Sequence, residues 1–537
     1  MRQQKEKNGI TLKVYAGTTG VLLAFDVTPE RRVGLLGFAI RRKFGSGAWR
    51  WLRGMLKFPS EAEPDYLPID TNLAPIQKFR WSDYSVYDDR PYTYELQAVY
   101  GTPGDLNYVV GPSISIRTEA IKKGKHQVVF NRAVAASQAY ARKDFADTNP
   151  DDESDPLHEK ARQWLTRGLR ELIINVFEQA VDANYGLDIA IYEFELPHFV
   201  DLLQAARARG VEVRVIYHAK KNDHQTEVNE EVLAPMPADT KKARVTTAIF
   251  HQKFVILKKR NAGGQLIPQK LLMGTANFTP NGLWRQANVM HVIEDKPLAS
   301  AYQQLFEQLW SSEGRGDTKT YINENQPLKT SESLFSSFSP RSEYVDIDFL
   351  EELINSAKSE VFICSAFSVH DRLLDALENG NPDMIRYGLQ NSRSRITGFH
   401  RNRSFTATAF LKDGLEGFLK ESTKGQRGNI YIHLKTLITD FSTDNPTVVV
   451  GSHNFSKPAS DKNDENFVVI RGDTGVADTY FCEMMRLYDH YRFRYNERKT
   501  EGEAASPMGL DTTDAWTIPY FDAENLKFQE RTRFSRA

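Results

Sequence analysis

The feature that most constrains the fold of this chain is a short motif that occurs twice. The C-terminal copy is HLKTLITD (433–440), followed by GSHN (451–454). A looser copy, HQK (251–253) followed by GTAN (274–277), lies about 180 residues upstream. Both copies end in Gly-Ser/Thr-x-Asn-Phe-Ser/Thr. A duplication of this kind predicts two similar structural repeats within one chain.

The residues around both copies alternate between helical and strand patterns. In the first half, helical periodicity at 158–181 and 199–210 alternates with strand-like runs at 187–194, 211–218, 250–257 and 270–278. The second half repeats this order with a helix at 345–359 and strands at 360–367, 431–438 and 447–455. We therefore expect an α/β fold of two repeats related by a pseudo-two-fold axis, with the site at their interface.

The first part of the chain has a different pattern. Residues 10–118 carry short alternating runs broken by turn residues, which predict an antiparallel β-sandwich. The stretch 79–101 resembles the later strands of a fibronectin type III module; the alternative is a β-rich extension packed directly on the repeats. The expected domains are a β-rich domain (1–120), a linker (121–156), repeat 1 (157–325), repeat 2 (326–497) and a C-terminal tail (498–537).

The residue types of the motif suit chemistry at a phosphodiester. A phosphoryl centre needs a nucleophile on one side, a proton donor for the leaving oxygen on the other, and positive charge near its equatorial oxygens. A spacing of two on a strand puts His and Lys on the same face. Paired His, Lys and Asn side chains supply this set without a metal. The candidates are His251, Lys253, Asn277, His433, Lys435 and Asn454.

These residues resemble the signature of the phospholipase D superfamily, which is H-x-K-x4-D followed by G-S-x-N and then N-x-E. The C-terminal copy matches closely, with Asp440 and Glu465 at the acidic positions. In the N-terminal copy Lys258 occupies the Asp position, and Asn288 falls where the downstream carboxylate would be. First motifs without Asp also occur in the tyrosyl-DNA phosphodiesterase branch. The resemblance implies two phospholipase D-like repeats and a metal-independent phosphodiesterase that needs no cofactor and passes through a phosphohistidine.

The difference between the copies predicts their roles. The resemblance implies that Glu465 supports the His433 imidazole, and a neighbouring carboxylate raises the pKa of a histidine. His433 is then the general acid, and later the base that activates water or an alcohol. The first copy lacks both carboxylates, so His251 is expected to stay neutral and to act as the nucleophile. Asp440 is expected to orient the second motif rather than to react.

Three classes of function remain open. We expect the first, cleavage of a phospholipid headgroup, because tandem repeats in one chain and a fused β module favour it. The second is a nuclease acting on DNA or RNA, which the basic stretch 391–405 favours, and the third is a non-catalytic phosphate-binding module. Two basic stretches, 39–58 and 391–405, are candidates for a peripheral membrane or nucleic-acid contact. The first interleaves six basic residues with aromatics that could instead fill a core, and the second could be a solvated loop.

Composition adds few constraints. The formal net charge is −1, so bulk charge does not draw the whole chain to nucleic acid or anionic lipid. Two cysteines, Cys364 and Cys482, cannot form a disulfide framework, which favours a reducing compartment. No apolar run approaches the length of a membrane-spanning helix. The sequence therefore predicts a soluble, cytoplasmic protein of open oligomeric state.

Overall fold

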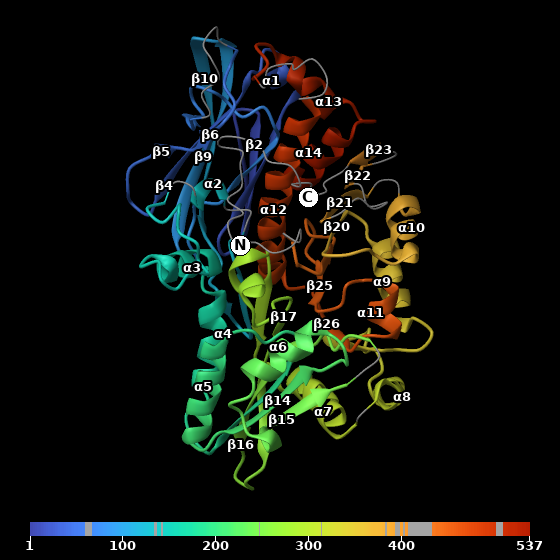
Figure 1. The fold of residues 1–537 in the computed structure, drawn as a ribbon. Coiled ribbons are helices and arrows are strands. Elements are labelled where there is room, and N and C mark those ends of the chain that lie inside the picture. Colours follow the sequence, from blue (N-terminus) through green and yellow to red (C-terminus); the bar gives the residue numbers. More distant parts are fainter. Residues whose placement is uncertain are drawn as a thin grey trace.

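The structure is a computed structural model. It describes residues 1–59, 67–133, 137–140, 143–245, 248–312, 314–381, 384–391, 398–400, 403–405, 432–500 and 509–536. A β-rich domain lies at one end of the molecule, and two α/β units lie beyond it with the long helix α12 (Thr474–Thr500) between them (Figure 1). The mixed α/β fold with an N-terminal β-rich domain is confirmed.

Two four-stranded antiparallel sheets form the N-terminal domain. The first has the order β1-β2-β3-β8, and the second β10-β9-β4-β5. All seven residues of β3, VLLAFDV, are buried, because this sheet is covered on both faces. The fibronectin type III resemblance stays a prediction. The elements are β1 (Arg2–Lys7), β2 (Ile10–Ala16), β3 (Val21–Val27), α1 (Pro29–Arg32), β4 (Gly37–Phe44), β5 (Arg50–Trp51), β6 (Arg53–Gly54), β7 (Ile69–Asp70), β8 (Arg80–Asp83), β9 (Pro91–Thr102) and β10 (Asp105–Arg117).

Repeat 1 is built on an eight-stranded sheet of order β11-β12-β18-β17-β16-β13-β14-β15. Its strands are β11 (Lys122–Lys123), β12 (His126–Phe130), β13 (Tyr185–Ile191), β14 (Glu212–His218), β15 (Lys241–Arg244), β16 (Lys253–Arg260), β17 (Leu266–Gly274) and β18 (Val289–Ile293). Its helices are α2 (Ser137–Tyr140), α3 (His158–Thr166), α4 (Leu169–Glu178), α5 (Pro197–Ala208), α6 (His224–Val232), η2 (Ala238–Thr240), η3 (Asn281–Arg285), α7 (Lys296–Ser311) and α8 (Arg315–Asn325). The single helix expected at 158–181 is broken between α3 and α4, where Arg167 and Gly168 are left-handed.

Repeat 2 is built on a six-stranded sheet of order β19-β26-β25-β24-β20-β21. Reading from β12, the first sheet has the matching order β12-β18-β17-β16-β13-β14, so the two repeats share one topology. The elements are β19 (Leu334–Ser339), α9 (Val345–Ser356), β20 (Glu360–Ser365), α10 (Asp371–Asn379), β21 (Ile385–Gln390), β22 (Gly398–His400), β23 (Arg403–Phe405), β24 (Thr436–Thr439), β25 (Thr447–Gly451), α11 (Lys457–Asp461) and β26 (Glu465–Arg471).

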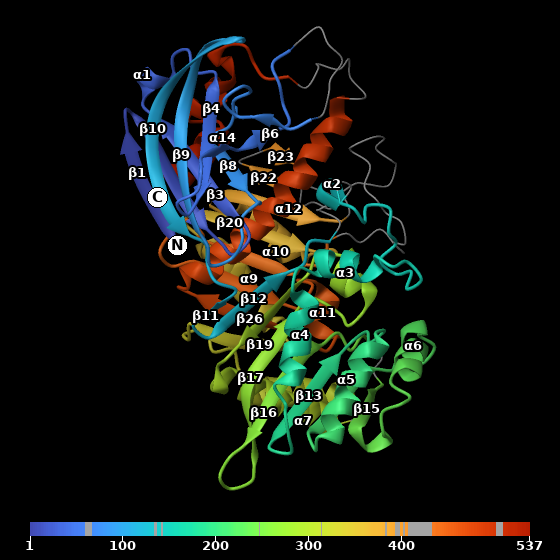
Figure 2. The same ribbon diagram turned by 90° about the vertical axis from the view of Figure 1, so that its left-hand side faces the viewer.

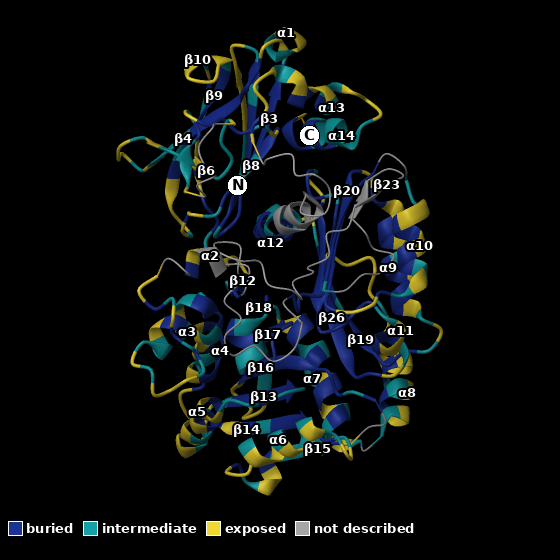
Figure 3. Ribbon diagram, turned by 45° about the horizontal axis from the view of Figure 1, so that its top comes forward, coloured by how far each residue is buried: buried dark blue, intermediate teal, exposed yellow. Residues whose placement is uncertain are grey.

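The two sheets are stacked with helices between and outside them. Helices α4 and α5 share a buried cluster with the outer face of the first sheet, and α9 and α10 share one with the outer face of the second. Helices α7 and α12 contribute to the central cluster, which both sheets line. The sheets are buried while the outer helices expose one face to solvent (Figure 3). No helix in the described ranges combines the length and apolar character needed to cross a bilayer.

The segment 121–156, which we expected to be a linker, contains the first strand of repeat 1. β12 pairs antiparallel with β18, and Val128, Val129 and Phe130 are buried. It occupies the same place in its sheet as β19 does in repeat 2. The composition of the acidic stretch that follows concealed this short strand, and only residues 143–156 run as turns without a strand.

The segment 498–537, which we expected to be a tail, is in large part a piece of the N-terminal domain. It contains η5 (Asp514–Thr517), α13 (Ile518–Phe521) and α14 (Leu526–Arg536). Trp516 and Tyr520 belong to the N-terminal core, and Phe534 packs in the central cluster against Tyr387. Figures 1 and 2 show α14 beside the N-terminal strands. Its aromatic side chains explain this placement, because they remove apolar surface from water.

Candidate functional site

The two His-x-Lys motifs meet at the junction of the repeats. Each motif precedes the central strand of its sheet and pairs with backbone of the other repeat. The His251 N–H donates to the Asp464 carbonyl at 2.9 Å, and the His433 N–H donates to the Ala287 carbonyl at 3.0 Å. Isolated bridges, Phe250 with Asp464 and Ala287 with Ile432, accompany these bonds. The backbone therefore holds the two motifs against each other across the pseudo-two-fold axis.

The four motif side chains form a compact, buried set. The ring centroids of His251 and His433 lie 6.4 Å apart, with their planes at 79°. Lys253 Nζ donates to the His251 carbonyl at 3.0 Å, and Lys435 Nζ donates to the His433 carbonyl at 2.9 Å. Both histidines are buried and both lysines are fully buried. The same arrangement thus occurs in both halves, and two ammonium groups face a site with little access to water.

The hydrogen bonds of the histidines fix their tautomers. His251 Nδ1 lies 3.1 Å from the Ser452 carbonyl oxygen and 3.4 Å from Glu465 Oε2. His433 Nδ1 lies 3.0 Å from the Thr275 carbonyl oxygen and 3.1 Å from Asn288 Oδ1. All four neighbours are acceptors, so each Nδ1 carries a proton. This leaves Nε2 of each ring as the nitrogen that is free for chemistry.

Glu465 contacts His251 rather than His433, which corrects the expected pairing. Asn288 takes the equivalent place at His433. The reason is geometric: Asp464, the residue before β26, pairs with His251 of repeat 1, and this carries Glu465 across the interface. Asn463 Nδ2 and the Asn454 N–H also donate to the Glu465 carboxylate, at 2.8 and 3.2 Å. Glu465 and Asn288 thus occupy equivalent places beside the two histidines, and the one carboxylate among them supports His251 of the first motif.

Asp440 and Lys258, the seventh residues after each His, lie away from the reacting groups. Asp440 follows β24 and accepts from the backbone N–H groups of Lys358 and Ser359, at 2.7 and 2.8 Å. It holds the turn that leads into β20. Lys258 is buried in an ion pair with Asp188 at 2.7 Å. Neither residue contacts a motif histidine, so the acid-to-lysine change in the first copy does not alter the site directly.

The glycine that opens each G-x-x-N segment is required by close packing. A Cβ at Gly274 would overlap the Val289 carbonyl, and a Cβ at Gly451 would overlap the Asn466 carbonyl. These glycines end β17 and β25, where the neighbouring strand of each sheet approaches closely. The turn that follows delivers the asparagine to the site in both halves. Oδ1 of Asn277 and Oδ1 of Asn454 are buried and lack hydrogen-bond partners among the described residues.

Three residues at the site were missed by the sequence analysis. The Tyr192 ring lies 5.3 Å from both the His251 ring and Lys253 Nζ. The Phe367 ring lies 6.4 Å from the His433 ring and 5.9 Å from Lys435 Nζ. Glu193 accepts a hydrogen bond from Asn277 Nδ2. All three follow the first parallel strand of their repeat, and the carboxyl ends of such strands are a common place for sites.

Burial dominates the electrostatics of the site. It lowers the pKa of Lys253 to about 7, with Glu193 and Glu465 opposing the shift, and it lowers the pKa of Lys435 well below its usual range. Burial, assisted by Lys253, lowers the pKa of His251 to about 4. The pKa of His433 also falls well below its ordinary value, first through burial and then through Lys435. Burial therefore favours the neutral forms of these four groups, and an anion placed between them would stabilise their charged forms.

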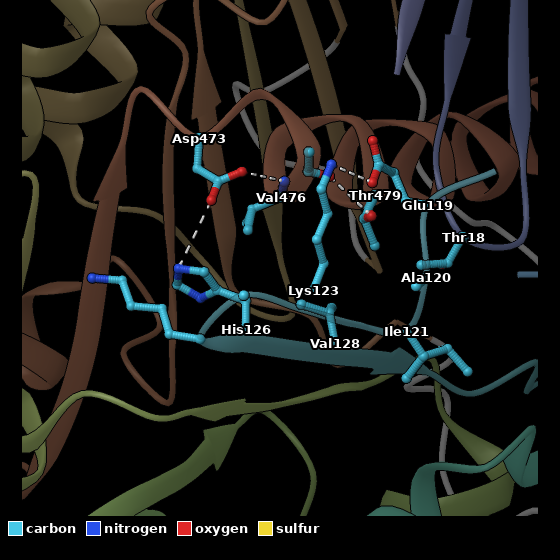
Figure 4. A pocket seen from close by; sticks show the side chains of 13 residues that line it. Thr18, Glu119, Ala120, Ile121, Lys123, His126, Val128, Asp473, Val476 and Thr479 are labelled. Carbon is cyan, nitrogen blue, oxygen red and sulfur yellow. Dashed lines mark hydrogen bonds and ion pairs between the residues drawn. The ribbon is translucent and has the colours of Figure 1, made fainter. Parts of the chain in front are cut away.

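The described residues contain no group of three or more His, Cys, Asp and Glu side chains arranged to hold a metal ion. A pocket of about 300 Å³ lies elsewhere, where β11 and β12 meet the start of α12 (Figure 4). Its Lys123 pairs with Glu119 at 2.6 Å, and Asp473 caps the helix through the Val476 N–H at 2.9 Å. This pocket contains none of the motif residues, so we place the candidate site at the two motifs.

Comparison with known families gives one match. The family model described as "Cardiolipin synthase, PLD-like domain" matches residues 176–310 and 350–488, which together make up just over half of the chain. These two segments lie in repeat 1 and repeat 2 and include both motifs. Among curated proteins, no sequence matches the chain.

Solved structures give weaker likenesses. Phosphatidylserine synthase from Haemophilus influenzae is 12% identical with a TM-score of 0.42, covering 69% of this chain and 94% of that one. Polyphosphate kinase from Porphyromonas gingivalis is 12% identical with a TM-score of 0.36, covering 56% and 42%. Nuc, a phospholipase D family member from Salmonella typhimurium, is 24% identical with a TM-score of 0.19, covering 30% and 94%. At these scores the likenesses identify no substrate.

Proposed function

The chain belongs to the phospholipase D-like family, and from this premise we propose that it cleaves a phosphodiester through a covalent phosphohistidine without a metal. The observation that carries the proposal is the meeting of both His-x-Lys pairs in one buried site, with the histidine rings 6.4 Å apart. A phosphoryl group between the rings would have a nitrogen on each side and two lysines beside its oxygens. This matches what in-line phosphoryl transfer needs.

We assign His251 as the nucleophile. Its Nε2 attacks phosphorus, and the phosphorus–nitrogen bond forms as the bond to the leaving oxygen breaks. The ring becomes positively charged in this step, and the Glu465 carboxylate near Nδ1 stabilises that charge. The assignment agrees with the role expected from the sequence, but for a different reason. The Glu465 carboxylate lies beside His251, the histidine that we propose forms the covalent bond to phosphorus.

We assign His433 as the general acid and base. Its Nδ1 faces a carbonyl and a neutral amide, so no carboxylate holds the proton that Nε2 must give to the leaving oxygen. The negative phosphodiester would favour the charged form of this ring, which burial and Lys435 disfavour in the free protein. In the second step Nε2 takes a proton from water, the water oxygen bonds to phosphorus, and His251 is released.

A phospholipid headgroup is the substrate that we propose, and a basic hairpin supports it. This hairpin, residues 41–53, joins β4 to β5 in the N-terminal domain. The Arg41 guanidinium lies 4.8 Å from the Trp49 ring and 5.8 Å from the Trp51 ring, and Phe44 is 54% exposed. None of these three aromatics belongs to the buried core of the domain, so the core alternative does not hold. Surface aromatics beside cations suit an anionic lipid surface.

The hairpin proposal predicts a loss of membrane binding. Replacing both Phe44 and Trp49 by Ser is expected to weaken binding to phosphatidylglycerol vesicles by at least about tenfold, because two aromatic side chains no longer enter the interface. Cosedimentation measures this. Tyr108→Ser, at an exposed position elsewhere in the same domain, is the matched control and should bind as wild type does. Unchanged binding of the hairpin variant would remove this support for a lipid substrate.

The basic stretch 391–405, which favours nucleic acid, lies largely outside the described residues; within it the structure describes Asn391 and the backbone strands β22 and β23. The cytoplasmic location also stays a prediction. A nuclease is therefore the alternative outcome of the activity test. The purified protein is incubated separately with phosphatidylcholine vesicles, phosphatidylglycerol vesicles, plasmid DNA and single-stranded DNA. Turnover of the nucleic acids alone would contradict the lipid proposal.

We expect the turnover in this test to survive EDTA. Lys253 and Lys435 supply the positive charge that a metal would otherwise place on the phosphoryl oxygens, and His251 supplies the nucleophile. The rate with EDTA should equal the rate without it to within about twofold. Activity that disappears in EDTA and returns with a divalent cation would show that the proposed mechanism is wrong.

A further inference from the structure

Glu193 breaks the two-fold symmetry of the site. The Glu195 N–H donates to the Phe278 carbonyl at 2.9 Å and the His370 N–H donates to the Phe455 carbonyl at 2.7 Å, so Glu193 stands where repeat 2 has Ser368. Its carboxylate accepts a hydrogen bond from Asn277 Nδ2. Backbone bonds keep the two residues side by side, since the Phe278 N–H donates to the Glu193 carbonyl at 3.1 Å. A carboxylate therefore accepts from the amide of one motif asparagine, and the other half has the neutral side chain of Ser368 at the corresponding position in the chain.

This contact opposes the binding of a phosphodiester. The Asn277 side-chain amide is a suitable donor to a phosphoryl oxygen, but in the free protein its Nδ2 already donates to Glu193. Glu193 and Glu465 favour the charged forms of Lys253 and Lys435 against the effect of burial, and a phosphodiester would add a further negative charge to the site. A carboxylate and a phosphate that share one buried amide would repel each other strongly.

Resting on the proposed function, we propose that Glu193 takes up a proton when a phosphodiester binds, and that its ionised form keeps the phosphate position closed. The proton comes from solvent and adds to the Glu193 carboxylate. Asn277 Oδ1, which is buried and has no partner among the described residues, can accept a hydrogen bond from the new carboxyl group. Asn277 Nδ2 is then released to a phosphoryl oxygen. Glu193 in this view sets the pH range in which the site accepts its substrate.

The electrostatic surroundings of Glu193 agree with this role. Burial raises its pKa to about 7; Lys253, the Asn277 amide and Lys435 act in the opposite direction, and Glu195 adds to the rise. Below this pH the carboxyl group is neutral and the position is open. Above it the carboxylate closes the position, so binding weakens as the pH rises, and loss of the Lys253 proton in the same range adds to the weakening.

The test uses dimethyl phosphate, which keeps a single negative charge across the pH range and needs no turnover. At pH 8, Glu193→Gln is expected to bind it at least about tenfold more tightly than wild type, because the neutral amide mimics the protonated acid. The same variant should bind as wild type does at pH 6. Asp201→Asn, which removes an exposed carboxylate of helix α5, is the control and should follow wild type. Isothermal titration calorimetry gives the affinities.

A second readout reports the proton itself. Infrared difference spectra at pH 8 should show a protonated carboxyl band when dimethyl phosphate is added to wild type and to Asp201→Asn, and no such band in Glu193→Gln. Equal affinities of wild type and Glu193→Gln at pH 8, or a band that persists without Glu193, would overturn the inference. If Glu193→Gln does not fold, Glu193→Ser takes its place. Proton-linked binding without any turnover would leave this inference standing while the proposed function fails.

Discussion

His251→Ala and His433→Ala are each expected to lower turnover of a nitrophenyl phosphodiester by at least about 10³-fold, because each removes one partner of a two-step transfer. The double variant should be no worse than the worse single variant, since residues that act as a unit are non-additive. The two rings lie in one site and their backbones are bonded across the repeats. Either loss therefore stops the whole reaction.

The control for this experiment is His198→Ala, which removes an exposed histidine of repeat 1 outside the site. It should retain the wild-type rate. Thermal melting of all variants separates loss of chemistry from loss of folding. A single variant that keeps near-normal turnover would contradict the shared site and would leave that copy of the motif as scaffold.

The second large effect concerns the covalent phosphohistidine, which we expect to accumulate in one histidine variant and to be absent from the other. His433→Asn should still accept phosphoryl from a nitrophenyl ester, because a good leaving group needs little protonation. It should then stall, because no base remains to activate water, and phosphate should accumulate on His251. His251→Asn should form no adduct. Mass spectrometry of the acid-labile, base-stable phosphate locates the modified residue.

This experiment decides between the two histidines. The contact between Glu465 and His251 predicts that the adduct is on His251, because the carboxylate stabilises the charged ring that bears phosphorus. An adduct on His433 in the His251 variant would reverse the roles. Glu465→Gln extends the test: it should slow formation of the adduct in the His433→Asn background, whereas Asp440→Asn, away from both rings, should not.

The sequence was sufficient to predict the two-repeat fold, because each motif is surrounded by the same order of helix and strand patterns and the strands are apolar. It also predicted that both His-x-Lys pairs would share one site. Both predictions depend on local patterns that occur twice. The strand β12 was missed because it is only five residues long and is followed by an acidic stretch whose composition suggested a linker.

The contacts between repeats could not be predicted from local patterns. Glu465 follows its own motif in the chain but reaches the histidine of the other repeat, since the carbonyl of Asp464 accepts from the His251 N–H and Asp464 pairs with Phe250. Glu193 stands in no known position of the motif, and its contact with Asn277 depends on how two loops meet. Both cases involve pairs more than 80 residues apart, whose contact is set by tertiary packing.

The C-terminal segment makes the first domain the last to be completed during synthesis. Phe79 of the N-terminal domain stacks on Trp516 at 5.4 Å, and the Trp516 indole donates to the Leu35 carbonyl at 2.8 Å. Arg531 pairs with Asp26 in the same region. A nascent chain must therefore keep this apolar face of its first domain exposed while both repeats are translated. The N-terminal domain is translated first, but its core can close only after the C-terminal segment has been made. We therefore expect its final folding to be slow and its exposed apolar face to need protection from aggregation until then.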